Sequence, residues 1–463
     1  MMNLESVIAA LGPTDVLGRA PVELRDLAYD ARAVVPGSLF FCVQGANADG
    51  HEFAPEAVER GAVALVGERP LDLPLPQLIV PSTRAAMAVV ADEFFDHPTG
   101  QLEVVGVTGT NGKTTTSFLL FAVLAAAGRR PGLLGTIEAR VGGERRGVKR
   151  TTPEAIDLQR TFREMVDAGD RSCAMEASSH ASTMRRLDRV RFAALVFTNL
   201  TQDHLDFHGT MEAYFEAKRR LFLEGRPPAA VNVGDPYGRR LAGELGPDVL
   251  TFGFAAQAEI GPNALDGIDL RLRGRFNAEN ALGALAAGRL LGLDHDAIAH
   301  GLESVRGVPG RFESIEEGQP FAVIVDYAHT PDALANLLRA ARGLATGRVL
   351  CVFGAGGDRD REKRPQMGRI VSGLADLAIV TSDNPRSEEP QAIIAAIVEG
   401  SSGEVEVEPD RAAAIARAIE VAREGDVVVI AGKGHEQGQQ FADRALTFDD
   451  RDTARDALRK ARA

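Results

Sequence analysis

A short run of glycine, lysine and threonine carries the clearest chemistry in this chain: Gly109–Thr115 reads G-T-N-G-K-T-T. Glycines let a backbone curl until successive N–H groups point at phosphate oxygens. Lys113 can place its charge on the β- and γ-phosphates, and Thr114 can offer a hydroxyl to Mg²⁺. A helix that begins near Lys113 adds the positive end of its dipole. The run therefore predicts nucleoside triphosphate binding, and the alternative is a Gly/Thr-rich turn with no ligand.

Acidic and basic side chains follow later apolar segments, at the points where strands should end. Glu176 lies in the run Met175–His180 (M-E-A-S-S-H), and Asp203, His204 and Asp206 follow another apolar segment. Because the carboxyl ends of parallel strands meet at one edge of a sheet, these side chains can share that edge with the loop. Glu176 is therefore a candidate Mg²⁺ ligand, and the alternative is a surface glutamate at a strand end.

Three further polar clusters lie in the C-terminal third: Gly357–Asp360 (G-D-R-D), Asp383–Arg386 (D-N-P-R) and Gly432–Glu436 (G-K-G-H-E). The guanidinium of Arg386 can grip a carboxylate with a planar, two-pronged fork. The first cluster adds a second arginine, and Glu436 offers an acidic partner for an ammonium group. These residue types suit a small zwitterion that carries an extra carboxylate, and the alternative is a solvated charged loop.

The elements that must position these residues alternate between short strands and helices, which predicts parallel sheets with crossover helices. We expect an α/β protein of three domains: an N-terminal α/β domain over residues 1–97, a central domain with the phosphate-binding loop and a mainly parallel sheet over 98–308, and a C-terminal Rossmann-like domain over 309–463. The expected strands cover residues 38–43, 62–66, 77–80, 102–107, 173–177, 193–197, 229–233, 321–326, 348–353, 377–381 and 427–431. The expected helices cover residues 55–59, 83–95, 115–127, 211–222 and 277–291.

The composition excludes several classes of protein. A net charge of −13 over 463 residues and the absence of tryptophan disfavour nucleic-acid binding and non-specific attachment to an anionic membrane. Three widely spaced cysteines, Cys42, Cys173 and Cys351, argue against a disulfide framework and a thiolate zinc site, and fit a reducing cytoplasm. No signal peptide and no apolar run near the roughly 20 residues of a bilayer span is visible. We expect a cytoplasmic monomer.

Taken together, the motifs resemble the Mur ligase family, which joins amino acids to a nucleotide-linked peptidoglycan precursor. The matching segments run in family order: T-G-T-N-G-K-T-T (108–115), M-E-A-S-S-H (175–180), F-T-N-L-T-Q-D-H-L-D-F-H-G (197–209), Y-F-E-A-K (214–218), R-F-N-A-E-N-A-L (275–282), G-V-P-G-R-F-E (307–313) and D-Y-A-H-T-P-D (326–332). The resemblance implies that ATP activates a carboxylate as an acyl phosphate, which an incoming amine displaces. The rival of a different class is a P-loop ATPase or kinase with a regulatory C-terminal module.

The resemblance also implies roles for single residues. Lys218, which by its own pattern reads as an exposed helix lysine, would be carbamylated and so become a carboxylate-like magnesium ligand. The implied Mg²⁺ ligands are Thr114, Glu176, His204 and the carbamylated Lys218, and the catalytic set is Lys113, Glu176, His204 and Lys218. The implied ATP contacts are Gly109, Thr110, Asn111, Gly112, Lys113, Thr114, Thr115, Asn280, Arg311 and Asp326.

Within the family, D-N-P-R with G-K-G-H-E resembles the ligases that add the third peptide residue. The implied substrates are UDP-N-acetylmuramoyl-L-alanyl-D-glutamate and meso-diaminopimelate, with L-lysine or L-ornithine as alternatives. The implied amino-acid contacts are Arg359, Asp383, Asn384, Pro385, Arg386, Gly432 and Glu436. The implied contacts of the UDP precursor, which the N-terminal domain would help to bind, are Tyr29, Ala31, Ala46, Asn47, Thr151, Thr152, Ser178, Met184 and Arg186.

The chain departs from the family pattern at four places. Ala31 replaces a serine hydroxyl of the family, Met184 stands where some relatives have glutamine, and Arg150 stands where an asparagine occurs. The stretch between Phe254 and Arg273 is shorter than in the family, which predicts a trimmed hairpin. None of these departures touches the expected ATP residues.

Overall fold

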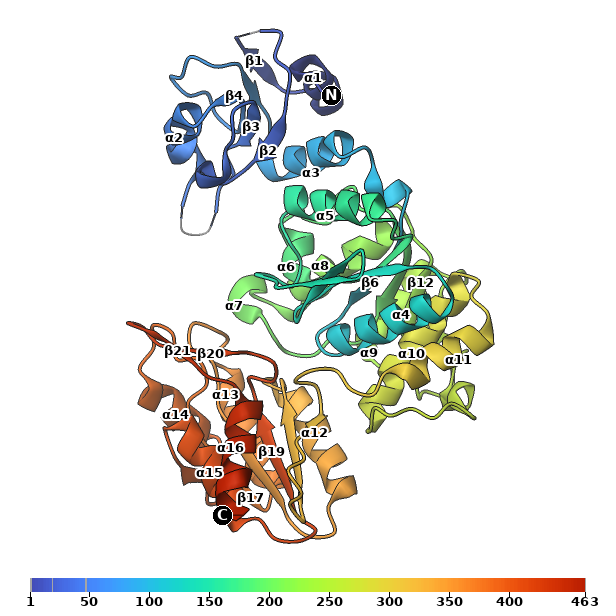
Figure 1. Ribbon diagram of the computed structural model, residues 1–463, viewed down its shortest axis with the longest axis vertical. Coiled ribbons are helices and arrows are strands. Elements are labelled where there is room, and N and C mark those ends of the chain that lie inside the picture. Colours follow the sequence, from blue (N-terminus) through green and yellow to red (C-terminus); the bar gives the residue numbers. More distant parts are fainter. Residues whose placement is uncertain (1, 19, 46–47, 463) are drawn as a thin grey trace. The chain divides into compact units, whose positions relative to one another are not determined.

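A computed structural model describes residues 2–18, 20–45 and 48–462 of the chain. The chain divides into two compact units, each built from helices and mostly parallel strands (Figure 1). Unit 1 comprises Met1–Val107, Gly128–Leu195 and Ala217–Pro228, and unit 2 comprises Thr108–Ala127, Val196–Glu216 and Ala229–Ala463. Among the described residues, no helix is long and apolar enough to cross a membrane.

The N-terminal part of unit 1 is a five-stranded sheet. Its strands are, in spatial order, β1 (Asp15–Leu17), β5 (Gln77–Ile79), β4 (Ala62–Gly67), β3 (Ser38–Phe41) and β2 (Asp26–Ala28), and only β1 runs antiparallel to its neighbour. Its α-helices are α1 (Leu4–Leu11), α2 (Ala54–Glu59) and α3 (Thr83–Phe94). Because side chains alternate along a strand, Phe41 and Val66 join the core with α1 and α3, whereas Phe40 and Leu65 join the core with α2.

The rest of unit 1 continues the parallel pattern. Strand β10 (Ser172–Glu176) lies between β6 (Glu103–Thr108) and β7 (Pro131–Leu134) and is parallel to both. An antiparallel meander, β8 (Ala139–Val141) and β9 (Glu144–Arg146), extends from β7. Helix α5 (Ala155–Asp167) packs against α3, and α6 (Ser179–Thr183) and β11 (Phe192–Phe197) follow along the chain. Glu176 therefore stands at the carboxyl end of a parallel strand, as expected.

In unit 2, the helix that follows the phosphate-binding loop is α4 (Lys113–Ala126), which packs against α10 (Arg275–Leu290) and α11 (His295–Ser304). A side chain at Gly301 would lie 2.4 Å from the Cα of Val123, so glycine permits the close approach of α11 to α4. Unit 2 also contains α7 (Leu205–His208), β12 (Ala229–Asn232), α9 (Pro236–Leu245) and β13 (Leu250–Phe252), while α8 (Met211–Leu223) begins in unit 2 and belongs to unit 1 from Ala217 on.

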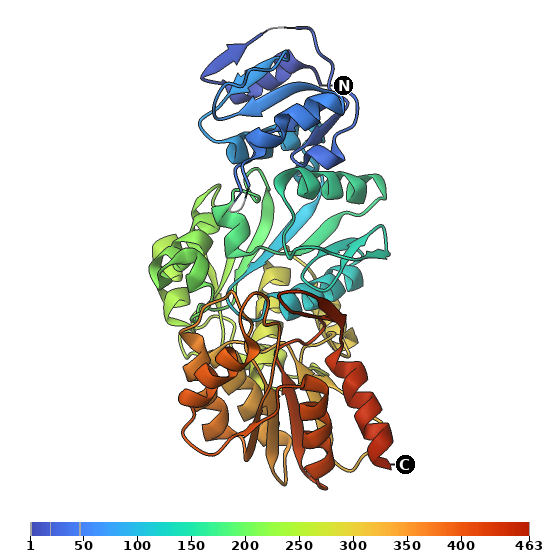
Figure 2. The ribbon, with the colours of Figure 1, turned by 90° about the vertical axis from the view of Figure 1, so that its left-hand side faces the viewer.

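The C-terminal part of unit 2 is a six-stranded sheet. Its strands are, in spatial order, β14 (Glu313–Ser314), β15 (Ala322–Asp326), β19 (Val427–Ala431), β16 (Val349–Phe353), β17 (Leu377–Val380) and β18 (Glu406–Val407), and only β14 is antiparallel. Its helices are α12 (Pro331–Leu344), α13 (Lys363–Leu374), α14 (Pro390–Glu399), α15 (Arg411–Val421) and α16 (Asp450–Arg462). Helices α12 to α14 cover one face, and α15 and the red α16 cover the other (Figures 1 and 2).

The strands and helices expected from the sequence are present to within about two residues, and the α/β class is confirmed. The sequence does not predict the helices other than α2, α3, α4, α8 and α10, nor several short strands: the parallel β2, β7, β13 and β18, and the antiparallel β1, β8, β9, β14 and the hairpin of β20 (Gly438–Gln440) and β21 (Ala445–Thr447). These strands are two to four residues long, so they carry no periodic pattern that a sequence window can detect. The hairpin matters because it lies beside one of the predicted polar clusters.

Candidate active site

The phosphate-binding loop joins β6 to α4, and two of its positions admit only glycine. Gly112 has φ +87°, and a side chain there would come within 2.3 Å of the Oδ1 atom of Asn280. Gly109 has φ +150°, and a side chain there would come within 1.9 Å of the Thr198 hydroxyl. Glycine thus lets Asn280, a predicted ATP residue, lie directly against the loop.

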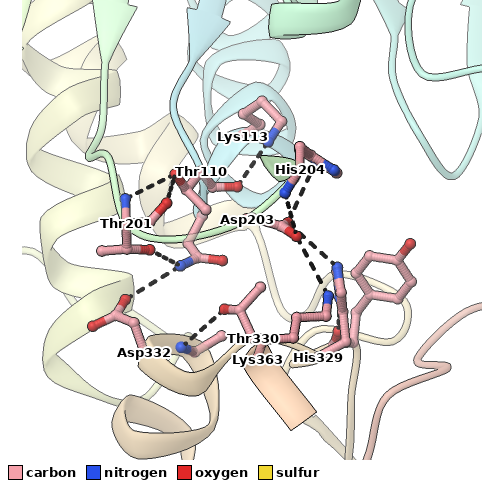
Figure 3. Close-up of polar contacts among 12 residues, drawn as sticks. Thr110, Lys113, Thr201, Asp203, His204, His329, Thr330, Asp332 and Lys363 are labelled. Atoms are coloured by element: carbon pink, nitrogen blue, oxygen red, sulfur yellow. Dashed lines mark hydrogen bonds and ion pairs between the residues drawn. The ribbon is translucent and has the colours of Figure 1, made fainter. Parts of the chain in front are cut away.

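A second segment, Thr198–Thr201, holds the loop in shape. The N–H of Thr110 donates to the Asn199 carbonyl, and the N–H of Asn111 donates to the Asn199 side chain, both at 2.9 Å. The Thr198 hydroxyl donates to the Asn111 carbonyl at 2.6 Å. The hydroxyl of Thr110 accepts from the Thr201 N–H at 3.0 Å and lies 3.1 Å from the Thr201 carbonyl, as Figure 3 shows. The T-N-L-T motif is therefore a clamp on the loop.

Lys113 folds back over this loop. Its ammonium lies 2.9 Å from the carbonyl of Gly109. It lies 2.8 Å from the carbonyl of Thr110, a contact drawn in Figure 3. A lysine held to the carbonyls of a glycine-rich loop lies within reach of phosphates that bind the same loop. The structure places Lys113 on the loop, and its contact with phosphate stays a prediction.

Arg311 lies in the G-V-P-G-R-F-E segment, just after the domain boundary expected at residue 308, and reaches the start of α4. Its guanidinium donates to the Thr114 hydroxyl at 3.1 Å and lies over the ring of Tyr327, 4.3 Å from the centroid. Asp326, at the end of β15, accepts the N–H groups of Phe312 at 2.6 Å and Ala328 at 2.7 Å. Burial raises the pKa of Asp326 from its usual value, and the charge of Arg311 opposes that rise.

Asp203 is the centre of a buried charge cluster. Lys363, itself buried, places its ammonium 3.4 Å from Oδ1, and the Nε2 atoms of His204 and His329 lie 3.4 Å and 3.7 Å from Oδ2 (Figure 3). Burial alone would raise the pKa of Asp203, but the hydrogen bond from His329 and the charges of Lys363 and His204 hold that pKa well below its usual value. The cluster therefore keeps Asp203 ionised near neutral pH.

The chain segment around α12 brings His329 to this cluster and a second acid, Asp332, to the phosphate-binding loop. Helix α12 begins at Pro331 because Thr330 caps it through the N–H of Ala333 and proline suits the first turn. Just before the cap, the Nδ1 of His329 bonds to the carbonyl of Tyr327 at 2.8 Å, which leaves Nε2 for Asp203. Just after it, Asp332 accepts from the Asn111 amide at 3.2 Å (Figure 3).

Glu176 is fully buried in unit 1 and held by one residue. Its Oε1 accepts the N–H of Thr136 at 2.7 Å, and its Oε2 accepts the Thr136 hydroxyl at 3.0 Å. A side chain at Gly135 would lie 2.8 Å from Oε1, so glycine makes room for the carboxylate. Glu176 is thus a fixed carboxylate and not the surface glutamate of the alternative interpretation.

Lys218 is fully buried in helix α8, so the expectation of an exposed helix lysine is wrong. The sequence of one helix does not show which of its residues are buried by elements from other parts of the chain. A buried cation is costly unless it is paired or neutralised, and carbamylation would convert this nitrogen into an oxygen donor.

Three of the four residues in the predicted metal set would offer the oxygen donors that suit Mg²⁺, whereas His204 would offer a ring nitrogen. Glu176 and Thr114 offer oxygen atoms, which Mg²⁺ prefers, and a carbamylated Lys218 would add another. Within the described part of the chain, no group of three or more His, Cys, Asp and Glu side chains could hold a metal by itself. That is compatible with Mg²⁺ sites that use one or two carboxylates together with substrate phosphates.

The residues predicted to bind the muramoyl peptide lie near Glu176 in unit 1. The Thr152 hydroxyl bonds to the Glu176 carbonyl at 2.8 Å and lies 3.2 Å from the Ser178 hydroxyl. Thr151 reaches the same group through the hydroxyl of Thr136, at 3.0 Å. The structure therefore brings Thr151, Thr152, Ser178 and Glu176 together.

Arg186 and Met184 belong to a neighbouring cluster around Glu154. The Arg186 guanidinium lies 2.7 Å from the Glu154 carboxylate and 3.1 Å from the sulfur of Met184. Arg84 and Arg150 pair with the same carboxylate at 3.2 Å and 2.9 Å. Burial lowers the pKa of Arg186 from its usual value, and Glu154 opposes that shift.

The remaining predicted contacts of the UDP precursor lie in the N-terminal part of unit 1. Tyr29 donates its hydroxyl to Asp157 at 2.6 Å, and burial together with this carboxylate raises the pKa of Tyr29. Ala31 is buried at the start of a short 3₁₀ turn. Ala46 and Asn47 lie outside the described residues.

The predicted amino-acid residues converge at the carboxyl ends of β17 and β19. The amide Nδ2 of Asn384 donates to Glu436 at 2.8 Å. Arg386 has φ +54°, donates its guanidinium to the Gly357 carbonyl at 2.6 Å, and donates its N–H to Gln440 of the β20–β21 hairpin at 3.0 Å. Burial and the like charge of Arg359 lower the pKa of Arg386 from its usual value.

Two glycines allow the loops that carry the predicted amino-acid residues to approach each other. A side chain at Gly432, where φ is +123°, would lie 2.5 Å from the carboxylate of Asp383, and one at Gly357 would lie 1.8 Å from the carbonyl of Pro385. Arg359 is exposed and donates to the neighbouring Asp358 carbonyl. Its guanidinium is therefore the least restrained member of the set.

Sequence reasoning missed several residues of the site. They are the clamp residues Thr198, Asn199 and Thr201, the partners His329, Lys363 and Asp332, the glutamate support Thr136, and the buried Lys433. Several stand inside motifs that were quoted for other residues. Their position beside glycine-rich or acidic motifs is the signal that could have identified them.

Comparisons with known proteins agree with the motifs. Three family models match the chain in order: "Mur ligase family, catalytic domain" over residues 23–95, "Mur ligase middle domain" over 107–288, and "Mur ligase, glutamate ligase domain" over 310–434. The chain belongs to the Mur ligase family. The resemblance stated from the sequence is thus confirmed.

Individual relatives cover the whole chain. A UDP-N-acetylmuramoyl-L-alanyl-D-glutamate–2,6-diaminopimelate ligase of Geobacillus thermodenitrificans is 45% identical and covers 100% of both chains. A Solibacter usitatus protein of the same name is 46% identical over 99% of this chain and 98% of its own. A solved structure with that enzyme name is 31% identical, with a TM-score of 0.65 over 96% of each chain. This chain is therefore similar along its full length to ligases of one named activity.

The Asp203 cluster gives a prediction about pH. Asp203→Asn should lower the free energy of unfolding by about 3–5 kcal/mol at pH 7, because it leaves the buried Lys363 without its carboxylate. A carboxyl group whose folded pKa is depressed stabilises the protein above its unfolded pKa of about 3.9, and this contribution disappears as the pH falls through the folded value. The gap in melting temperature between wild type and variant should therefore shrink as the pH falls below about 4.

The measurement is calorimetric melting across that pH range, with Asp266→Asn, an exposed aspartate, as the matched control. A gap that stays the same at pH 3.5 and pH 7 would contradict a depressed pKa of Asp203.

Proposed function

We propose that this chain is an ATP-dependent ligase that joins meso-diaminopimelate to the D-glutamate of UDP-N-acetylmuramoyl-L-alanyl-D-glutamate in peptidoglycan precursor synthesis. Full-length similarity to ligases of that name supports the proposal. The observation that carries it is the amino-acid site, in which Asn384, Arg386 and Glu436 combine donors for a carboxylate with an acceptor for an ammonium group. A simple P-loop ATPase or kinase needs no such site.

The chemistry has two steps. A D-glutamyl carboxylate oxygen attacks the γ-phosphorus of ATP, the bond to the ADP oxygen breaks, and an acyl phosphate forms. The deprotonated amine of the diamino acid then attacks the acyl carbon, and inorganic phosphate leaves as the amide bond forms. Neither step needs a redox partner, so the task of the protein is to position groups and neutralise charge.

The residues in hand suit these tasks. Lys113 and the N–H groups of the loop would hold the β- and γ-phosphates, with Arg311 as a further positive group and Asn280 and Asp326 beside adenine and ribose. Thr114, Glu176, His204 and a carbamylated Lys218 would hold Mg²⁺, which neutralises phosphate charge when bound. Donors that are already fixed by backbone contacts lose little freedom when the substrate binds.

The nucleotide-linked substrate would use residues of unit 1. Thr151, Thr152, Ser178, Met184 and Arg186 would contact the muramoyl peptide, and Tyr29, Ala31, Ala46 and Asn47 the UDP part. We further propose domain boundaries near residues 97 and 308, a monomer, and a cytoplasmic site of action, where ATP is supplied. Three buried free cysteines are compatible with a reducing compartment.

The finer choice among diamino acids also belongs to this proposal. Arg386 and Asn384 favour a side chain that ends in a carboxylate as well as an ammonium group, which meso-diaminopimelate has and L-lysine and L-ornithine lack. L-lysine and L-ornithine are therefore the control substrates for assays of this activity.

The first prediction tests the activity itself. Phosphate release from ATP should require both the UDP-dipeptide and a diamino acid, because the acyl phosphate forms only on bound precursor and resolves only with an amine. A coupled phosphate assay with each component omitted in turn, and with L-lysine and L-ornithine in place of meso-diaminopimelate, measures this. Equal ATP turnover without the UDP-dipeptide would falsify the ligase proposal.

The second prediction concerns Arg386. Arg386→Ala should lower kcat/KM for meso-diaminopimelate by about a hundredfold, since losing the partner of a desolvated charge costs about 2–4 kcal/mol. The KM for ATP should change little. Arg417→Ala, which removes an exposed arginine paired with Glu406 on the same part of the chain, is the matched control. Unchanged kinetics for Arg386→Ala would mean that this guanidinium does not reach the amino acid.

The third prediction concerns Lys218. Lys218→Ala should reduce activity by at least about tenfold, since even outer partners of a metal ligand are worth about 10–100-fold, and a short-chain carboxylic acid should restore part of it. Independently of activity, ¹³C-bicarbonate should give a carbamate carbon signal in wild type that disappears in this variant but persists in Lys460→Ala, an exposed control. A wild-type spectrum without that signal would remove the carbamate.

A further inference from the structure

Lys433 is a fully buried lysine inside the amino-acid site, between the end of β19 and the β20–β21 hairpin. Its ammonium lies 2.9 Å from Oδ1 of Asn384 and 3.3 Å from Oε2 of Glu436. Both partners are residues that the proposed function assigns to the amino acid. The buried ammonium of Lys433 therefore affects which hydrogen-bond donors and acceptors Asn384 and Glu436 can present to a ligand.

The first consequence concerns the orientation of the Asn384 amide. An ammonium group can only donate, so the atom that faces Lys433 must be the carbonyl oxygen of the amide. The same oxygen accepts the backbone N–H of Gln440 at 3.0 Å, and the NH₂ group then points to Glu436 at 2.8 Å. Asn384 is thereby left with donor capacity only, which suits a ligand carboxylate and not a ligand ammonium.

The second consequence concerns Glu436. Its Oε2 is shared by Lys433 and Asn384, and none of the described residues bonds its other oxygen, Oε1. A ligand that offers only an ammonium group meets a carboxylate whose charge Lys433 already offsets. A ligand that also offers a carboxylate gains from the cationic side of the same cluster, where Arg386 and Lys433 lie.

We propose that Lys433 is a positioning residue that sets the selectivity of the amino-acid site for a side chain ending in both ammonium and carboxylate groups. Its ammonium orients the Asn384 amide so that the NH₂ group can donate to a ligand. Its charge also weakens the attraction of the Glu436 carboxylate for a ligand that carries only an ammonium group. The inference rests on the proposed function and deepens it, because it concerns the choice between meso-diaminopimelate and L-lysine.

The test compares these two substrates in Lys433→Met, which keeps the length and apolar stem of the side chain and removes the charge. Initial rates at saturating ATP and UDP-dipeptide should show kcat/KM for meso-diaminopimelate lowered roughly 10–100-fold, mostly through KM. The value for L-lysine should stay level or rise, so the ratio of the two kcat/KM values should fall by at least about tenfold. The KM for ATP should be unchanged, and Lys433→Arg, which keeps a charged donor, should recover part of the ratio.

Lys460→Met, at an exposed position of helix α16, is the matched control and should leave the ratio as in wild type. Asn384→Asp is a second route to the same question, because an aspartate can still pair with Lys433 but has no NH₂ group to donate. It should lose meso-diaminopimelate selectivity even if Lys433→Met does not fold.

Two outcomes would overturn the role of Lys433: equal losses for both substrates in Lys433→Met, or an unchanged ratio in Asn384→Asp. Wild-type turnover that needs no diamino acid would instead overturn the proposed function. The two failures are therefore distinguishable in one set of assays.

Discussion

The direction of parallel strands is the constraint on which the rest of this structure depends. Every strand that runs parallel to its neighbours ends at the same edge of its sheet, so residues that follow such strands are gathered without any dedicated scaffold. In unit 2 this edge receives the residues after β15, β16, β17 and β19, and three of those four segments carry the residues predicted to bind the amino acid. The polar residues occur where strands end because only there can loops leave the sheet.

Glycine determines how closely those loops can approach one another. A side chain at Gly310 would lie 2.1 Å from the N–H of His435, and one at Gly434 would lie 2.6 Å from the Gly310 carbonyl. The segment that carries Arg311 to the phosphate-binding loop therefore crosses directly against the segment that carries Lys433 and Glu436. A substitution at either glycine would therefore disturb a residue predicted to bind ATP and a residue predicted to bind the amino acid together.

The sequence predicts best those features whose cause is local. The phosphate-binding loop can be predicted because its glycines, lysine and threonine lie within seven residues. The main strands can be predicted because each is a short apolar run. The burial of Lys218 cannot be predicted from the sequence of helix α8, because the elements that cover the helix lie elsewhere in the chain. Lys433 and its partner Asn384 are 49 residues apart, so their relation exists only once β17 and β19 have assembled in one sheet.

Two of the departures from the family pattern, Arg150 and Met184, lie around one buried carboxylate. Arg150 and Met184 replace amide residues of the family, yet both contact the same cluster, in which Arg186 and Arg150 share the buried Glu154. One carboxylate with several arginines leaves net positive charge, and a thioether is only a weak acceptor for Arg186. The sulfur of Met184 would therefore compete less with an anionic substrate for the Arg186 guanidinium than the side-chain oxygen of a glutamine at this position would. Arg150 pairs with Glu154 directly, whereas Met184 reaches the same carboxylate only through Arg186.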